Sequence, residues 1–290
     1  MIDLNPGPMP AGRMVPAGNN SYHVIEKGSG RDAVFLHGGG PGCTAWSDFA
    51  VVSELFGRHY RCILPDLLQY GKSGKPTITG PMWDFHSHSL AQLLDRLRVS
   101  RADLVCNSWG GTIALRFATL YPDRVRSLTI TGSMPVFHGP LGPLPENGRR
   151  GRNARDIYYG GAGPSLDKMR ALITRLEWYD ASKLPEETVR IRYLQSIDPE
   201  EMALAARSDN PRGDWQDLGP VLGQVICPTL FCWGLYDAFL TPDYPMMLTR
   251  MVQRGQLHIL DACSHHLQEE RPQQYFQIVH GFLQQPEQGN

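Results

Sequence analysis

This chain of 290 residues is predicted to fold as an α/β protein, with a mostly parallel central sheet flanked by helices. Short apolar runs typical of buried strands alternate with segments of helical spacing toward both ends of the chain. Between these two parts, residues 133–213 lack strand-like alternation and contain glycine, proline and two helical stretches instead. We therefore expect one core domain, residues 1–132 and 214–290, and a helical lid, residues 133–213, inserted after the sixth strand.

The expected elements can be placed in order along the chain. Apolar runs predict strands at residues 32–36, 60–64, 102–107 and 125–130, and after the inserted segment at 228–234 and 256–260. Helices are expected at 88–97, directly after the strand 102–107, and at 272–283. The second of these carries Ile113, Phe117 and Tyr121 on one face and ends before Pro122.

Ser108 lies where one of these strands ends and a helix begins. The surrounding sequence is Leu104-Val105-Cys106-Asn107-Ser108-Trp109-Gly110-Gly111. A serine in a sharp turn between a strand and a helix is typical of a nucleophile elbow, which exposes the hydroxyl above the positive end of the helix. The usual pattern is G-x-S-x-G, and Cys106 stands at the first glycine. We expect Ser108 to be a nucleophile.

A glycine-rich loop precedes this serine in the chain. The strand Asp32–Leu36 runs into His37-Gly38-Gly39-Gly40-Pro41-Gly42. Such a loop lets backbone N–H groups approach a developing oxyanion, and the expected donors are the amides of Gly39 and Trp109. The alternative is an ordinary turn, which is the commoner use of glycine runs.

An acid and a base follow the last two predicted strands. Asp237 comes just after the strand 228–234, on the side where α/β sheets place ligands, although it could instead cap a helix that starts near Pro242. His265 and His266 lie in the turn after the strand 256–260. We expect Ser108, Asp237 and His265 to form a catalytic triad, with His266 as a neighbour in the substrate pocket.

Composition excludes several other classes of function. The net charge of −1 provides no broad attraction to nucleic acid or to an anionic membrane. The proline-rich N-terminus does not resemble a signal peptide, and no apolar run reaches the length of about 18 residues that a membrane span needs. Six scattered cysteines are typical of free thiols in a reducing compartment, so we expect a cytoplasmic protein. No spacing of metal ligands is present, and we expect neither a metal nor a cofactor.

The inserted segment contains one arginine on a partly apolar helical face. Val189, Arg192, Tyr193 and Ser196 share that face by their spacing. A buried arginine needs an anionic partner, and the spacing alone favours a carboxylate of the protein, such as Glu187 or Asp198, over a ligand. The basic cluster Arg149, Arg150, Arg152 and Arg155 is expected to be a solvated face.

From about residue 20 to 284 the chain resembles the carbon–carbon bond hydrolases that act on meta-cleavage products of aromatic rings, a branch of the α/β-hydrolase fold. The matching pieces are the run His37–Gly42, Trp46, the elbow Asn107–Gly111 and the segment Val189–Tyr193. The turn around His265 is similar to the G-H-x-x-x-E-x-x-P turn usual in the α/β-hydrolase fold as a whole. The chain order serine, aspartate, histidine is also that of this fold. The resemblance implies a small-molecule substrate and a homodimer or larger homo-oligomer.

The resemblance also implies a reaction and a set of substrate contacts. The substrates are vinylogous 1,5-diketones of the 2-hydroxy-6-oxohexa-2,4-dienoate type, and Arg192 and Asn107 match residues that hold their carboxylate end. The resemblance therefore makes Arg192 a ligand rather than a structural ion pair. Gly38, Gly40, Asp48 and His266 are the other residues we expect to bind substrate.

Several positions depart from the family pattern. Asp48 stands where an asparagine is usual, His266 replaces a tryptophan, and Ser264 and Cys106 replace glycines. A carboxylate at Asp48 could repel an anionic substrate unless it is protonated or paired. Two other functions therefore stay open: a serine esterase or amidase with the same triad, which a structural ion pair at Arg192 would favour, and a non-catalytic ligand receptor on the same scaffold.

Overall fold

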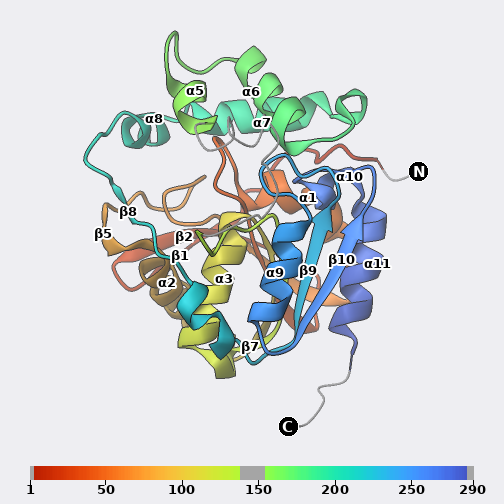
Figure 1. The fold of residues 1–290 in the computed structure, drawn as a ribbon. Helices are drawn as coiled ribbons and strands as arrows, with labels where there is room; N and C mark the ends of the chain where they lie inside the picture. Colours follow the sequence, from red (N-terminus) through yellow and green to blue (C-terminus); the bar gives the residue numbers. More distant parts are fainter. Residues whose placement is uncertain (1–2, 138–153, 286–290) are drawn as a thin grey trace.

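The computed structural model describes residues 3–137 and 154–285, and a central sheet with helices on both faces forms its body (Figure 1). The main sheet of the described chain has eight strands in the order β1-β2-β4-β3-β6-β7-β9-β10. Only β1–β2 and β2–β4 pair antiparallel, and the other neighbours are parallel, as the sequence predicts. The strands are β1 (Arg13–Ala17), β2 (Asn20–Lys27), β3 (Arg31–Leu36), β4 (Tyr60–Pro65), β6 (Ala102–Asn107), β7 (Val125–Thr131), β9 (Thr229–Gly234) and β10 (Gly255–Leu260).

Each face of the sheet has its own apolar core. On one face α2 (Met82–Arg96), α3 (Trp109–Leu120) and α9 (Asp243–Met251) pack against the strands, around side chains such as Phe117 and Trp233. On the other face lie α1 (Ala45–Phe56), the short α10 (Leu267–Glu270) and α11 (Pro272–Leu283), around Phe35 and Phe56. Covered on both faces, the central strands β6 and β9 are buried along their whole length, which explains why they read as continuous apolar runs.

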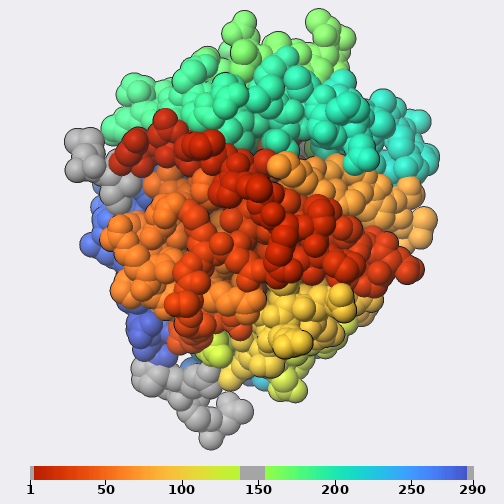
Figure 2. Space-filling view, turned by 180° about the vertical axis from the view of Figure 1, so that it is seen from behind, coloured from red at the N-terminus to blue at the C-terminus, as the bar shows by residue number. Residues whose placement is uncertain are grey.

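A layer of short helices lies beyond the carboxyl ends of the parallel strands, and we call residues 154–205 the helical layer. Figures 1 and 2 show it across the top of the molecule, and in Figure 1 it lies above the ends of β9 and β10. It contains α5 (Ala154–Tyr159), α6 (Leu166–Leu172), a π-helical turn η2 (Ile173–Glu177), a 3₁₀ turn η3 (Ala181–Lys183), α7 (Glu186–Ser196) and α8 (Pro199–Ala205).

The chain returns from the helical layer to the main sheet through a small sheet. There β8 (Arg212–Asp214) pairs parallel with β5 (Ile78–Pro81). Two further 3₁₀ turns, η1 (Pro122–Arg124) and η4 (Gly219–Gln224), connect elements of the core. The helical layer, residues 154–205, lies within the segment 133–213 that was expected to form a lid. Residues 138–153 of that segment lie outside the described residues.

The structure contains elements that periodicity did not predict. The strands β1 and β2 and the helix α1 were not expected, and α2 begins at Met82 rather than near residue 88. Helix α1 has a clear start signal, because the side chains of Thr44 and Ser47 each accept a hydrogen bond from the other's backbone N–H.

The cysteines are free thiols, and the helices that the structure describes are not of the membrane-spanning kind. None of the six cysteines forms a disulfide, and all six are buried. Within the described parts of the chain, every helix is too short or too polar to cross a bilayer.

Candidate active site

Ser108 occupies a strained turn between β6 and α3. Its backbone has φ 49° and ψ −115°, a conformation that non-glycine residues rarely adopt. The turn is held by the Ser108 N–H, which donates to the Thr131 carbonyl at 2.7 Å, and by the Ser133 hydroxyl, which donates to the Ser108 carbonyl at 2.7 Å. A Cβ atom at Gly110 would lie 2.1 Å from the Leu36 carbonyl oxygen, so only glycine allows α3 to pack this close to β3. The local geometry is that of a nucleophile elbow.

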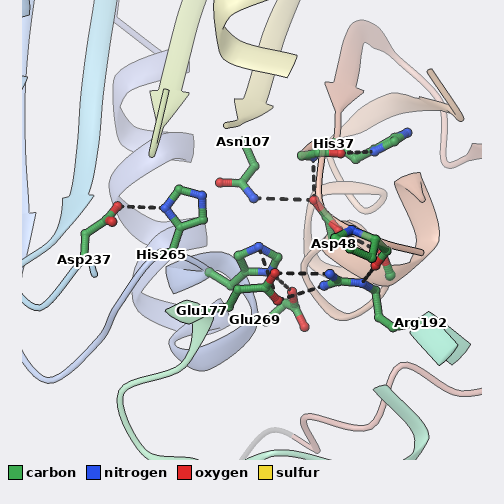
Figure 3. A network of polar contacts seen from close by, with 12 residues as sticks. His37, Asp48, Asn107, Glu177, Arg192, Asp237, His265 and Glu269 are labelled. Atoms are coloured by element: carbon green, nitrogen blue, oxygen red, sulfur yellow. Dashed lines mark hydrogen bonds and ion pairs between the residues drawn. The ribbon is translucent and has the colours of Figure 1, made fainter. Parts of the chain in front are cut away.

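Asp237 and His265 meet at the ends of β9 and β10 (Figure 3). His265 Nδ1 lies 2.9 Å from Asp237 Oδ2, and both side chains are almost fully buried. The other oxygen of Asp237 accepts the backbone N–H groups of Phe239 and Leu240 at 2.8 and 3.0 Å. Asp237 therefore orients the imidazole and caps a local turn, but it does not cap α9, which begins at Asp243.

Gly132 leaves the space that the His265 ring fills. It has φ +59°, and a Cβ atom there would lie 2.4 Å from Cε1 of His265. Ser108 and His265 line one cavity, although no hydrogen bond joins their side chains among the described residues. Catalytic hydrogen bonds of this kind often tighten only when substrate is bound.

The glycine-rich loop lies directly beside Ser108. A Cβ atom at Gly39 would overlap the ring of Trp109 at 2.5 Å, and the Tyr70 hydroxyl donates to the Gly39 carbonyl at 3.0 Å. Trp109 is the first residue of α3, so its N–H has no partner within the helix. Gly39 and Trp109 line the same cavity as Ser108, which is where the sequence predicts the oxyanion donors.

Asp48 is paired rather than free. Its Oδ2 atom accepts the Gly38 N–H at 2.7 Å and the Asn107 side-chain N–H at 3.4 Å (Figure 3). Burial by itself raises the pKa of Asp48, but nearby His266, His37 and Arg192 outweigh it and the pKa is lowered. Asp48 is therefore an ionised carboxylate that fixes the start of the glycine-rich loop, and neither Asp48 nor Asn107 is among the side chains that line the cavity.

Arg192 forms an internal ion pair with Glu177 of the helical layer. Its two terminal nitrogens donate to the two carboxylate oxygens of Glu177 at 2.8 and 3.1 Å, and Nε donates to the Pro41 carbonyl at 2.9 Å. All five N–H donors of a guanidinium lie in one plane, and this arrangement uses both of its edges. The Arg192 side chain is only 1% exposed and does not line the cavity, whereas Glu177 does.

His266 is the ionisable neighbour of this pair. Its Nδ1 atom contacts Glu269, and its Nε2 atom lies 3.9 Å from a Glu177 oxygen. Burial lowers the pKa of His266, but the carboxylates of Glu177, Glu269 and Asp48 overcome this and raise it to about 9. The ring of His266 lies 5.5 Å from that of His265 and faces the cavity, so a cation stands beside His265 at neutral pH.

Three side chains of this cluster lie close enough together to be considered as metal ligands. Asp48, His266 and Glu269 offer ligand atoms within 4.8 Å of one another. Each of these atoms already serves the hydrogen bonds and ion pairs of the network, which provides a complete account of their placement.

The cavity has a volume of about 440 Å³, in the range of small-molecule sites. Of the residues predicted to form the site, it brings together Gly38, Gly39, Gly40, Ser108, Trp109, His265 and His266. Its other walls are mostly apolar. They include Trp83, Met134, Leu172, Trp215, Phe239 and Leu240.

Sequence did not identify four charged residues that line the cavity, Glu177, Arg155, Asp156 and Arg212. Glu177 was not considered as the partner of Arg192, because a π-helical turn places it near Arg192 from 15 positions away. Arg155 and Arg212 line the cavity, so the prediction of a solvated face is wrong for Arg155, while Arg149, Arg150 and Arg152 lie outside the described residues. No local pattern distinguishes these side chains from surface charges.

Comparisons with known proteins agree with this geometry. A family model described as the alpha/beta hydrolase fold matches residues 32–272. The chain is 32% identical to 2-hydroxy-6-oxo-2,4-heptadienoate hydrolase of Pseudomonas putida, over 94% of this chain and 96% of that one. It is also 32% identical to 2-hydroxy-6-oxononadienedioate/2-hydroxy-6-oxononatrienedioate hydrolase of Burkholderia vietnamiensis, over 90% of each chain. The structure resembles that of a meta-cleavage product hydrolase from Pseudomonas fluorescens, with a TM-score of 0.79 at 23% identity, covering 93% of this chain and 97% of that one.

Proposed function

We propose a reaction for this chain, which belongs to the α/β-hydrolase fold family and, within it, to the meta-cleavage product hydrolases. The reaction is hydrolysis of the carbon–carbon bond between C5 and C6 of a 2-hydroxy-6-oxohexa-2,4-dienoate. Its products are a 2-hydroxypenta-2,4-dienoate and a carboxylic acid. The observation that carries this proposal is the identity of 32% to a heptadienoate hydrolase along 94% of the chain.

The first step is conversion of the dienol to its keto form. The 2-hydroxyl group loses a proton and C5 gains one, with His265 as the group that moves the proton. The resulting C2 ketone is conjugated with the C3–C4 double bond. Through this system it can accept the electron pair of the C5–C6 bond when that bond breaks. Asp237 supports this step because its carboxylate, 2.9 Å from Nδ1, stabilises the imidazolium and keeps the ring oriented.

The second step is addition to the C6 carbonyl. Ser108, or a water molecule activated by the triad, attacks C6, and the amides of Gly39 and Trp109 stabilise the oxyanion. The tetrahedral intermediate collapses with rupture of the C5–C6 bond, and the electron pair passes along the conjugated chain to the C2 oxygen. That oxygen then takes from His265 the proton that Ser108 or the water gave up, which forms the 2-hydroxydienoate. Where Ser108 forms an acyl-enzyme, water releases the acid in a further step.

His266 is the cation that we assign to the dienoate carboxylate. It faces the cavity and adjoins His265, whereas Arg192 is paired with Glu177 behind the glycine-rich loop. Gly38 and Gly40 complete this end of the cavity. Arg192, Asn107 and Asp48 then act as positioning residues, which hold the loop and Glu177 through the contacts given above.

A second function is favoured by one observation. The Arg192–Glu177 pair leaves no free guanidinium at the position where the family resemblance predicts one, as expected for an esterase or amidase that uses the same triad on a different acyl group. The mechanism at Ser108 would be the same, but the leaving group would be an alcohol or amine rather than a carbanion.

One experiment separates these two functions. The purified protein is mixed with 2-hydroxy-6-oxo-6-phenylhexa-2,4-dienoate, and the loss of its yellow colour and the release of benzoate are followed. We expect rapid bleaching by the wild type and a rate at least ~100-fold lower for Ser108→Ala. Absence of bleaching together with Ser108-dependent turnover of a p-nitrophenyl ester would replace the proposal with the esterase.

We also propose a cytoplasmic protein that forms a homodimer or a larger homo-oligomer. This rests on the family membership and on the six buried cysteines, none of which is in a disulfide in the described chain. Light scattering after size-exclusion chromatography measures the assembly directly, and a monomer at micromolar concentration would contradict it.

A further inference from the structure

Building on the proposed function, we infer that the acyl end of the cavity binds an anionic group on Arg155 and Arg212. The preferred substrate is then a dioate, in which the substituent beyond the scissile bond ends in a second carboxylate. The proposed reaction alone leaves this substituent open, because the relatives include hydrolases of a monoacid and of a diacid.

The two arginines reach the cavity from different segments. Arg155 belongs to α5 of the helical layer and Arg212 to β8, and both line the cavity together with Ser108. Both guanidinium groups are directed at one carboxylate, that of Glu201 in α8, which Arg212 contacts at 3.5 Å and Arg155 more closely. The side chains of Arg155, Arg212 and Glu201 are 24%, 14% and 4% exposed.

One carboxylate does not neutralise two guanidinium groups. The Nη1 atoms of Arg155 and Arg212 are buried and have no hydrogen-bond partner among the described residues, and the same holds for one oxygen, Oε2, of Glu201. Asp156 also borders the cavity, but it is exposed, so solvent screens its charge. This end of the cavity therefore has unmet donors and an excess of positive charge, the features of a carboxylate site.

The opposite end of the cavity has a different charge balance. There the cations Arg192 and His266 lie among Glu177, Asp48 and Glu269, and burial raises the pKa of Glu269 to about 7, so this cluster is close to neutral overall. No described hydrogen bond or ion pair connects this cluster with Arg155, Arg212 or Glu201.

The position of the base decides which end receives the acyl group. His265 must protonate C5, so the dienoate half lies on the side of His265 and its neighbour His266. The acyl half then extends past the oxyanion donors toward Trp109. Arg212 stands there, with its guanidinium carbon 5.9 Å from the Trp109 ring centre and 5.1 Å from that of Tyr70.

The wall between the nucleophile and the arginines is apolar. Trp83, Trp109 and Trp215 pack edge to face with ring centres 5.4 to 5.8 Å apart, and all three border the cavity. A short methylene chain fits against such a surface, and its terminal carboxylate would meet Arg155 and Arg212. An apolar wall followed by two guanidinium groups is complementary to an acyl substituent of the type CH₂CH₂COO⁻.

The test compares two substrates of equal length. The first is 2-hydroxy-6-oxonona-2,4-dienedioate, whose hydrolysis releases succinate, and the second is 2-hydroxy-6-oxonona-2,4-dienoate, which ends in a methyl group and releases butanoate. Bleaching gives kcat/KM for both with the wild type, Arg155→Gln, Arg212→Gln and Glu201→Gln. Arg190→Gln is the control, because Arg190 is exposed and paired with Glu187 outside the cavity.

We expect the wild type to prefer the dioate by at least ~10-fold in kcat/KM, mainly through KM. Arg155→Gln and Arg212→Gln should remove most of that preference while turnover of the methyl-terminated substrate stays close to wild type, and Arg190→Gln should change neither. Glu201→Gln should lower KM for the dioate, because it removes the competing carboxylate. This gain keeps the test informative if an arginine variant fails to fold.

Three results would contradict the inference. Equal kcat/KM for the two substrates in the wild type would exclude a second carboxylate site, and so would arginine variants that lose activity on both substrates equally. A higher KM for the dioate in folded Glu201→Gln would do the same. Turnover of the methyl-terminated substrate in these cases leaves the proposed function intact, whereas turnover of neither substrate by the wild type would remove both.

Discussion

The two sides of the cavity are held in place by different means. On the side of the sheet, Ser108, Gly132, Asp237 and His265 stand at the ends of four neighbouring strands, β6, β7, β9 and β10. Their positions depend on backbone turns, such as the positive φ of Ser108 and Gly132. On the side of the helical layer, charged groups hold one another across long sequence separations, as in the Arg192–Glu177 pair.

The two sides therefore have different roles: one carries the reacting groups and the other influences which substrate is bound. In the proposed mechanism the sheet side provides the nucleophile, the base and the oxyanion donors, which any acyl-transfer reaction on this fold needs. The helical layer and β8 provide Glu177, Arg155 and Arg212, which set the charge that a substrate meets. We therefore expect variants on the sheet side to lose turnover, and variants on the other side to change stability or substrate preference.

The largest effect is expected on the sheet side, from Asp237→Asn. The amide can retain the contacts to the Phe239 and Leu240 N–H groups but cannot stabilise the imidazolium of His265. We expect kcat to fall by about 10⁴-fold with little change in KM. Single-turnover bleaching measures it, and a loss of less than tenfold would remove Asp237 from the triad.

On the side of the helical layer, a substitution of Arg192 is expected to have a comparably large effect, on stability rather than on turnover. Arg192→Met leaves Glu177 buried without its partner, which costs about 3–5 kcal/mol in the free energy of unfolding. The double variant Arg192→Met with Glu177→Gln should recover most of this, since no charge is then left unpaired. Urea unfolding measures both. A stable single variant whose KM for the dienoate rises sharply would instead identify Arg192 as a direct substrate ligand.

The next effect is the pH dependence that His266 introduces. Its pKa of about 9 in the folded chain exceeds the ordinary value of 6.5, so its contribution to stability is complete below pH 6.5 and is lost as pH rises through 9. The same loss of charge should raise KM for a dienoate above pH 9. In His266→Gln we expect KM to be higher at pH 7, by about tenfold, and to lack the rise near pH 9. A wild-type KM that stays flat from pH 7 to 10 would contradict the assignment of His266.

The smallest effect is expected at Cys106, where the elbow pattern has glycine. Its thiol is fully buried in the core on the α3 side of the sheet, and burial raises its pKa well above the ordinary value, so it does not act as a thiolate. Cys106→Ala should lower the free energy of unfolding by about 1 kcal/mol and leave kcat unchanged. A large loss of kcat would show that the elbow depends on this side chain as well as on its backbone.

Sequence was informative where neighbouring residues determine the geometry. The strand–turn–helix pattern around Ser108 and the glycines at 38–40 predicted the elbow and the loop. Glycine is required at Gly110 and Gly39, because a Cβ there would lie 2.1 Å from a backbone oxygen and 2.5 Å from the Trp109 ring. Asp237 and His265 could be placed because both follow apolar strands. By contrast, β1 and β2 were missed because their apolar patterns are short. Helix α1 was missed because it is buried on nearly all sides and therefore has no one-sided apolar stripe.

The chain by itself therefore determined the parallel sheet, the order of its catalytic groups and their common edge, because strand direction and turn chemistry are local properties. Only the tertiary structure decided how the charges are distributed. Glu177 rather than Glu187 or Asp198 pairs with Arg192, and Arg155 lies at the cavity instead of on a solvated face. Whether a charge is neutralised or free depends on which distant carboxylate packs against it, and no sequence spacing encodes that contact.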